Sequence, residues 1–348
     1  MIQKIQAQTQ SQKPQVFCLD IDGSFSQNLP LSCQVDLSES IAWDFFRDCT
    51  NEFHFETVAQ SLIPDGQSDK FWSQAARTVF VALCLRVKAE NPEASLQDLY
   101  QLTCETPLAI LKEKMRGTAA GSLVSGDHDD KFFASIVGTM STYCSKLRYF
   151  LSGEGHAFSL ENLFATHSDL LVQISQTRLA ALKPILTVWF ELIIERILSS
   201  ESDLGWESKF VVILDELASL NQIPSLPMLA SRGRKYGVTL LLGIQDIDQL
   251  KALYRDSAES LAANLSTKFF LRQGSQKNAI WAAEIIGSEQ HQKQRRSTSF
   301  GSSDHRDSIS LSEQEVKDFV VLPTELLTLN ARAAIVRQLH FNPVNLIF

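Results

Sequence analysis

Two adjacent acids, Asp215 and Glu216, directly follow an apolar run, Phe210–Leu214, that predicts a buried strand. A carboxylate at the carboxyl end of a central strand can hold Mg²⁺ through bound water, and a second carboxylate beside it can activate an attacking water. The pair therefore has the residue types that hydrolysis of a nucleotide phosphate requires. The same two acids would also suit the start of a helix at Leu217, because acids favour helix N-termini.

A glutamine, Gln245, ends the next apolar run, Val238–Ile244. A polar side chain at the end of a strand can sense a γ-phosphate or the attacking water, as glutamines do in other nucleotide hydrolases. The alternative is that Gln245 only satisfies backbone groups of its own loop. Taken together with Asp215 and Glu216, it favours the hydrolytic half of a P-loop ATPase site.

A compact basic turn, Ser231–Gly237, lies between these two apolar runs and contains Arg234. Arginine is suited to stabilising transition-state charge on a nucleotide bound by a neighbouring subunit. Residues 231–277 hold eight Lys and Arg against four Asp and Glu, which is compatible with contacts to a phosphate backbone. For any one of these lysines, a solvated surface position is the alternative.

The phosphate-gripping half of such a site is missing from the sequence. No G-x-x-x-x-G-K-S/T stretch occurs in the 348 residues, and no Gly-Lys dipeptide occurs at all. The lysine that would neutralise the β- and γ-phosphates is therefore absent, as are the backbone N–H groups that would cradle them. Because charge-assisted hydrogen bonds contribute roughly 1.5–3 kcal/mol each, we expect nucleotide binding to be weaker by several kcal/mol.

The composition limits the class of protein. The net charge of −8 argues against a general nucleic-acid coat, and the 44% of hydrophobic residues suffices for a sizeable core. Six cysteines without a C-x-x-C pair favour reduced thiols over disulfides or zinc. No apolar run reaches the roughly 18 residues that a membrane span needs. The histidines lack metal-ligand spacing, although His128 lies in an acidic stretch, Asp127–Asp130, that we interpret as a polar loop.

The elements that must position these side chains alternate between strands and helices at both ends of the chain. We expect strands at Gln15–Asp20 and at five later segments, and a long amphipathic helix over Leu179–Leu198. The later strands are Leu170–Ile174, Phe210–Leu214, Val238–Ile244, Lys268–Arg272 and Ala333–Val336. Continuous apolar runs indicate strands covered on both faces, hence a mostly parallel sheet.

Between the first strands and the later ones, the pattern is helical. Ser95 with Asp98 three residues later indicates a capping box at the start of one of these helices. The sequence thus predicts an α/β fold with an inserted all-α domain. We expect a disordered tail at 1–14, a first part of the nucleotide-binding domain at 15–68, the all-α domain at 69–165, and the rest of the nucleotide-binding domain at 166–348. The Ser-rich stretch 291–312 reads as an exposed loop.

Several motifs together resemble the TraD-type coupling ATPases of conjugative type IV secretion systems. The similarity runs from about Val16 to about Leu329. The matching stretches are Ser61–Pro64, Phe71-Trp72 with Ala75–Arg77, Ala181–Pro184, Ile213–Leu217, Ile223–Leu226, Gly233–Gly237, Gly243–Gln245, Asn278–Ala283 and Ser310–Ser312.

This resemblance implies a RecA-like domain in a hexameric ring at the cytoplasmic face of the bacterial inner membrane, passing DNA or a relaxase–DNA complex to the secretion channel. It implies ATP and Mg²⁺ as cofactors, with Asp215 holding Mg²⁺ and Glu216 as the catalytic carboxylate. Gln245 would be the sensor and Arg234 the arginine finger. The all-α domain would face incoming DNA or relaxase.

The chain departs from the family pattern, because the membrane helices and the phosphate loop do not occur in it. Relatives also tend to carry Asp-Pro-x-Gly-Glu-Phe where this chain has Asp20–Phe25. One hypothesis is a shortened coupling ATPase that hydrolyses ATP weakly or not at all alone. The other is a non-catalytic docking module that binds DNA, relaxase or a full-length coupling protein.

Overall fold

The computed structural model of the chain describes residues 13–21, 23, 25, 31–37, 39–66, 70–124, 130–152, 157–201, 208–299, 308–338 and 341–347, with backbone alone for 291–299 and 308–317. The chain divides into two compact units, residues 1–261 and 262–348. Of the expected tail at 1–14, residues 1–12 lie outside these ranges, whereas Lys13 donates from Nζ to Asp169 Oδ2 at 2.9 Å.

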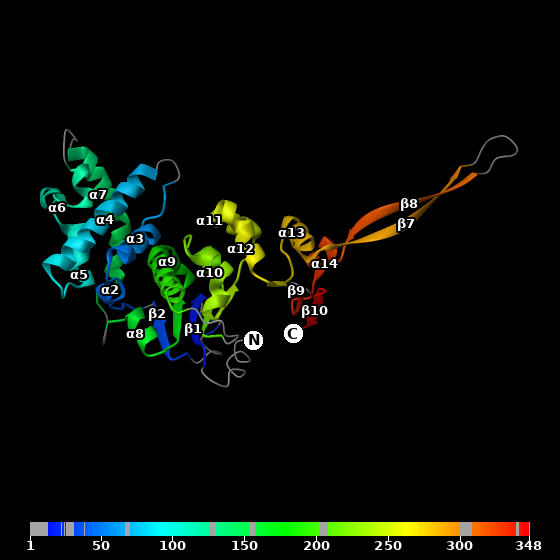
Figure 1. Cartoon of the computed structure of the whole chain (residues 1–348), viewed down its shortest axis with the longest axis horizontal. Helices are drawn as coiled ribbons and strands as arrows, with labels where there is room; N and C mark the ends of the chain where they lie inside the picture. The colour runs from blue at the N-terminus through cyan, green and yellow to red at the C-terminus, as the bar shows by residue number, and fades with distance from the viewer. Residues whose placement is uncertain are drawn as a thin grey trace. The chain divides into compact units, whose positions relative to one another are not determined.

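The first unit is built on a five-stranded sheet in the order β2-β3-β1-β4-β5 (Figure 1). The strands are β1 (Gln15–Ile21), β2 (Cys33–Asp36), β3 (Leu170–Ile174), β4 (Phe210–Leu214) and β5 (Val238–Leu242). Every neighbouring pair is parallel, as the continuous apolar runs predict. Parallel strands need helices on their faces, and the long helix α9 (Gln176–Leu198) supplies thirteen buried residues, Trp189 among them.

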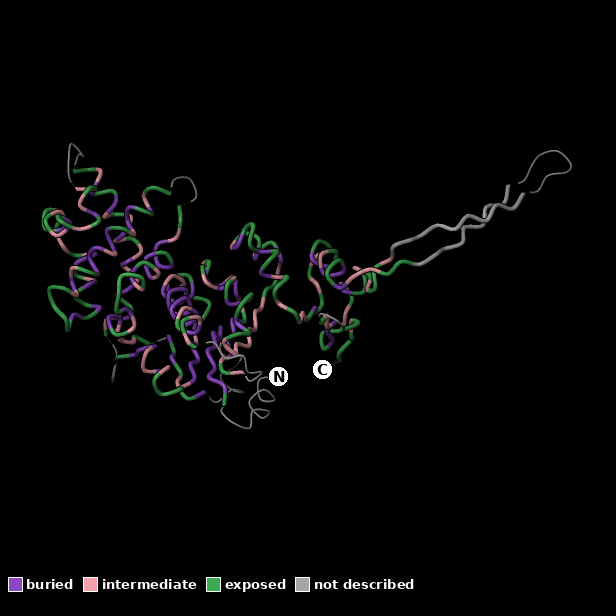
Figure 2. The backbone as a smooth tube through the Cα atoms, in the orientation of Figure 1, coloured by how far each residue is buried: buried purple, intermediate pink, exposed green. Residues whose placement is uncertain are grey.

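The strands differ in how far they are covered. β1 is buried along its whole length, and β4 from its second residue onward (Figure 2). β5 is the outermost described strand on its side of the sheet, and all five of its residues are half-buried. The expected strand at Val238–Ile244 therefore exists, but it is covered less completely than its neighbours.

The segment between β2 and β3 is helical. It begins with α2 (Phe45–Asp48) and α3 (Glu52–Leu62) and continues through α4 (Lys70–Glu90), α5 (Leu96–Tyr100) and α6 (Leu108–Met115) to α7 (Asp130–Cys144). The short α8 (Leu160–Ala165) leads into β3. The capping box at Ser95 and Asp98 is confirmed, because the Asp98 carboxylate accepts the Ser95 N–H at 2.7 Å and the Ser95 hydroxyl accepts the Asp98 N–H at 3.4 Å.

The remaining described helices of the first unit come before and after β5 in the chain. The helix α10 (Leu226–Arg232) and the 3₁₀ turn η5 (Gly233–Tyr236) lead into β5, and α11 (Ile247–Tyr254) follows it. The helix α12 (Ala258–Asn264) spans the point where the two units divide.

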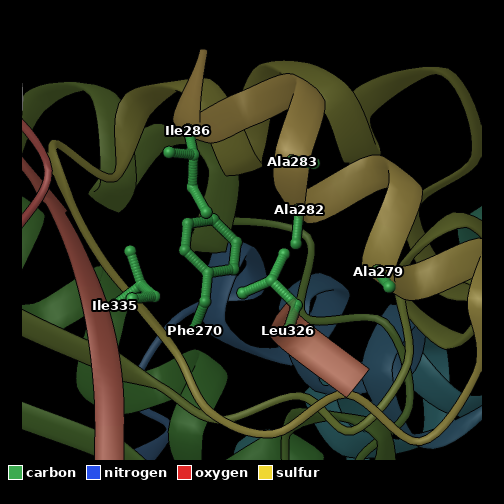
Figure 3. Close-up of a cluster of buried hydrophobic side chains, with 7 residues drawn as sticks. All are labelled: Phe270, Ala279, Ala282, Ala283, Ile286, Leu326 and Ile335. Atoms are coloured by element: carbon green, nitrogen blue, oxygen red, sulfur yellow. The ribbon is translucent and has the colours of Figure 1, made fainter. Parts of the chain in front are cut away.

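The second unit corrects two sequence expectations. Strands do form near 268–272 and 333–336, as β6 (Thr267–Phe270) and β9 (Ala333–Gln338), but they lie outside the parallel sheet. With β10 (Val344–Ile347) they make a separate antiparallel sheet in the order β10-β9-β6. After α12, the described residues of this unit form the helices α13 (Gln276–Ile286) and α14 (Pro323–Thr328). One face of the sheet packs on them through the buried cluster Phe270, Ala279, Ala282, Ala283, Ile286, Leu326 and Ile335 (Figure 3).

The second correction concerns the stretch 291–312, which is not a loop throughout. β7 (Ser288–Ser299) pairs antiparallel with β8 (Ser308–Phe319) in a continuous register from Ser288↔Phe319 to Ser299↔Ser308. Residues 300–307 of the expected loop lie outside the described ranges. The expectation fails because a two-stranded ladder satisfies its own backbone groups and does not need the apolar alternation that marks a half-buried strand.

Candidate functional site

The carboxyl ends of three neighbouring strands meet at one edge of the parallel sheet. Leu19 of β1 pairs with Leu214 of β4, and Leu214 pairs with Leu242 of β5. The residues that come next in each strand or loop are Asp20, Asp215 and Gly243. In open α/β sheets this edge is where ligands bind, because loops and helix starts converge there.

Glu216 and Gln245 are in direct contact at this edge. The Gln245 side-chain amide donates from Nε2 to Oε2 of Glu216 at 2.6 Å. Partial burial raises the pKa of the Glu216 carboxyl, the hydrogen bond from Gln245 acts against this rise, and the charge of Asp215 adds to it. The contact places the two side chains together at the sheet edge. The Glu216 side chain makes no capping hydrogen bond to the 3₁₀ turn η4 (Leu217–Ser219) that follows it.

A third carboxylate, Asp20, belongs to the same group of side chains. Asp20 is fully buried, and its Oδ2 accepts the backbone N–H of Phe25 at 3.0 Å. The pKa of Asp215 is raised first by partial burial and then by the nearby charge of Asp20. The sequence analysis did not select Asp20 as a site residue. The available signal was an acid near the end of an apolar strand, the same signal that selected Asp215.

Gly243 holds the two strand ends close together. A Cβ atom on this residue would lie 1.7 Å from the carbonyl oxygen of Asp215, so only glycine fits. The Gly243 N–H donates to the Leu214 carbonyl at 2.8 Å, and the Gly243 carbonyl accepts the Leu217 N–H at 2.9 Å. The backbone on both sides of Asp215 and Glu216 is therefore fixed to the end of β5.

The structure does not bring Arg234 to these acids. Arg234 is exposed in η5, and Gly237, which follows this turn in the left-handed region (φ 67°), comes directly before β5. Gln245 follows the opposite end of β5. Five residues of strand at ~3.3 Å each separate the two ends by about 16 Å. Within one chain, Arg234 thus lies at the amino edge of the sheet and the carboxylates at the carboxyl edge.

The chain also matches a known protein family. The family described as the type IV secretion-system coupling protein DNA-binding domain matches residues 1–347. The chain belongs to this family. The resemblance drawn from the sequence is thereby confirmed.

A curated relative of this coupling-protein chain is the coupling protein TraD of Escherichia coli (strain K12), which is 26% identical over 298 residues. The match covers 83% of the present chain and 41% of TraD, so the chain spans less than half the length of that relative.

Solved structures of the coupling protein TrwB share the fold. The unbound TrwBdeltaN70 aligns with a TM-score of 0.80 at 20% identity, over 96% of this chain and 78% of that one. TrwB in complex with ADP and Mg²⁺ aligns with a TM-score of 0.78, also at 20% identity and over the same shares of both chains. The expected α/β class with a parallel sheet flanked by helices is confirmed by this likeness.

In the ranges that the structure describes, no group of three or more His, Cys, Asp or Glu side chains is placed to hold a metal ion. His128 lies outside those ranges. No described helix is both long and apolar enough to cross a membrane. The six cysteines are free thiols.

Proposed function

We propose that the carboxyl edge of β1, β4 and β5 is the hydrolytic half of a Mg²⁺-ATP site that drives conjugative DNA transfer. The observation that carries this proposal is the contact between Gln245 and Glu216, immediately beside Asp215, at the ends of adjacent parallel strands. Membership of the coupling-protein family supports it, as does TrwB, whose structures include complexes with ADP and Mg²⁺ and with an ATP analogue.

Asp215 is suited to hold Mg²⁺ through water. It is an exposed carboxylate at the end of a central strand, and Mg²⁺ keeps several of its waters and uses one or two carboxylates plus the substrate phosphates. A magnesium site of this kind does not need a cluster of three protein ligands. When bound, the ion would neutralise the charge that Asp20 and Asp215 place at this edge, together with charge on the phosphates.

Glu216 is suited to accept a proton from the attacking water. Its raised pKa makes it a stronger base than an ordinary carboxylate, and the Gln245 amide fixes one of its oxygens. The same amide can turn from Glu216 to a γ-phosphate or to the water itself, which is the role we propose for a sensor. The chain's own residues thus supply water activation and metal binding.

The sequence contains no phosphate loop to grip the β- and γ-phosphates. We therefore propose weak or no ATP hydrolysis by this chain alone. Arg234 at the opposite end of β5 suits a role in trans, on a nucleotide held by the next subunit of a ring. The basic turn that contains it also suits contacts with DNA phosphates, in keeping with the description of the family.

A Mg²⁺-ATP binding titration on the folded chain tests the proposal. Asp215→Ala is expected to abolish binding, and Asp256→Ala, which removes an exposed acid in η6 (Arg255–Ser257), is the matched control. Binding lost only in Asp215→Ala supports the site. Because the phosphate loop is absent, we expect this binding to be weak. Equal binding by Asp215→Ala and the unmodified chain, or no binding at any accessible ATP concentration, would contradict the site, and the second candidate, a non-catalytic docking module for DNA, relaxase or a full-length coupling protein, would then be favoured.

A further inference from the structure

The segment that directly follows Glu216 is held by side chains and not by a strand ladder. Residues 218–225 run from η4 to the start of α10. Three alternate backbone N–H groups in this segment are accepted by side chains. Asn221 donates to Thr187 Oγ1 at 2.9 Å, Ile223 to the Tyr254 hydroxyl at 3.2 Å, and Ser225 to Glu191 Oε2 at 3.1 Å.

Three polar residues of α9 contact this segment from one face of the helix. Lys183, Thr187 and Glu191 are spaced four residues apart, which places them one above another. Lys183 donates from Nζ to the Ala218 carbonyl at 3.0 Å, and the other two accept the N–H groups of Asn221 and Ser225. We call these three residues the polar row.

The polar row lies where polar groups are costly. Thr187 is fully buried and Glu191 is 3% exposed. A buried polar group is tolerated only when it is hydrogen-bonded, and apolar side chains would fill the same volume without that requirement. Thr187 is bonded on both sides, since its hydroxyl also donates to the Lys183 carbonyl at 2.8 Å. Each member of the row is thus used to fix a particular backbone group of the segment.

We propose that the polar row positions Glu216 in the nucleotide site. Two bonds hold the chain directly after Glu216: the Leu217 N–H donates to the Gly243 carbonyl, and Lys183 donates to the Ala218 carbonyl. Loss of the support from α9 leaves only the first of them, so the Glu216 carboxylate can shift from Gln245. A displacement of about 1 Å at a reacting group can cost on the order of 100-fold in rate. The three side chains touch no reacting atom in this role, and they act through the backbone that carries Glu216.

The same helix connects the candidate site to the inserted helical segment. One turn beyond Glu191, Glu195 Oε1 accepts the hydroxyl of Thr57 at 2.8 Å, and α3 packs along α9. α3 leads through Pro64 to α4, the longest helix of the insertion. A movement of the insertion that shifts α9 would therefore reach the segment 218–225 through the polar row.

The role of Glu216 in this inference rests on the proposed function. Amide hydrogen exchange on the full chain tests whether the polar row holds the segment 218–225. Thr187→Val keeps the shape of the side chain and leaves the Asn221 N–H without its acceptor. Exchange in peptides covering 217–226 should become about tenfold faster, as expected for a buried donor left unpaired. Thr187→Ser restores a hydroxyl and should restore the unmodified rate.

Thr57→Val is the matched control, because it also removes one hydroxyl bonded to α9 but does not contact the segment. Acceleration confined to 217–226 in Thr187→Val supports the inference. Equal acceleration in both variants, or none in either, overturns it. In assemblies that hydrolyse ATP, Thr187→Val should lower kcat and leave KM unchanged, whereas equal loss with Thr57→Val would show a merely structural role.

The exchange comparison does not depend on nucleotide binding. If the unmodified chain binds no nucleotide, the proposed function fails, and the local exchange result still decides whether the row holds the segment. If nucleotide binds and exchange is unaffected by Thr187→Val, the proposed function stands and the polar row is refuted.

Discussion

Glu191 gives the first unit a pH-dependent stability whose size follows from its burial. Burial raises the pKa of this carboxyl from 4.5 to about 7, against the hydrogen bonds from Ser225, and the charge of nearby Glu195 raises it further. The side chain is 3% exposed. A shift from 4.5 to about 7 corresponds to about 3 kcal/mol of differential stability between the two protonation states.

The sign of the effect follows from linkage. An acid whose pKa is higher in the folded state than in the unfolded state binds more protons when folded, so folding is favoured at low pH. The loss of folding stability caused by burying Glu191 is absent below pH 4.5. It grows as the pH rises toward 7 and is fully present above that pH. Between pH 5 and pH 8, Glu191 should therefore lower the free energy of unfolding by about 2–3 kcal/mol.

Glu191→Gln removes the titration and keeps an oxygen that can accept the Ser225 N–H. The stability difference between this variant and the unmodified chain should shift by about 2–3 kcal/mol in favour of the variant between pH 5 and pH 8. Urea unfolding followed by tryptophan fluorescence measures it. Four of the five tryptophans, at positions 43, 72, 189 and 206, belong to the first unit, so the signal reports mainly on that unit.

The comparison between two pH values cancels any constant cost of the new amide group. Glu56→Gln, which changes an exposed glutamate on α3, is the control and should leave the pH dependence unchanged. Parallel stability curves for Glu191→Gln and the unmodified chain would refute the reasoning. They would show that Glu191 is solvated in the folded protein or that its hydrogen bond from Ser225 fully offsets burial.

Four other substitutions have expected outcomes. Gly243→Ala should destabilise the first unit by about 3 kcal/mol in the same urea assay, since its Cβ would lie 1.7 Å from a backbone oxygen. A Cβ at Gly138 would have no atom within 4 Å, so Gly138→Ala should stabilise α7 by about 0.5–1 kcal/mol. Asp48→Ala should cost about 3 kcal/mol or more by thermal unfolding, because Asp48 accepts hydrogen bonds from the Trp43 ring N–H, the Ser159 hydroxyl and two backbone N–H groups at the start of α8. Arg234→Ala should change the Mg²⁺-ATP affinity of the single chain by less than about twofold, given the ~16 Å length of β5, and a tenfold loss would contradict its placement at the amino edge.

The parallel sheet could be predicted because its strands are buried on both faces. The runs at Gln15–Asp20, Leu170–Ile174 and Phe210–Leu214 are apolar without alternation, and only a covered strand tolerates that pattern. The antiparallel sheet of the second unit could not be separated from it. Runs such as Ala333–Val336 are too short for periodicity to distinguish a strand covered on both faces from one that packs on helices with a single face.

The site residues that follow strand ends, two acids and an amide, could be predicted from the sequence. The side chains that hold the neighbouring backbone could not. Asp215, Glu216 and Gln245 are marked by the strands before them, and the structure joins two of them in a hydrogen bond. The polar row had no comparable signal. Lys183, Thr187 and Glu191 lie in a helix whose periodicity is dominated by apolar residues, and their partners are backbone groups, which have no sequence signature.

β5, the outermost described strand on its side of the parallel sheet, has a consequence for how this chain behaves at high concentration. Val238–Leu242 contains no charge, no proline and no bulge, and natural proteins use those devices to keep a sheet edge from recruiting another strand. An edge of this kind is a template for a further parallel or antiparallel strand from any chain that reaches it. Self-association of the isolated chain should therefore begin at β5, and a single lysine at Thr239 should keep the protein monomeric at concentrations where the unmodified chain aggregates in light scattering.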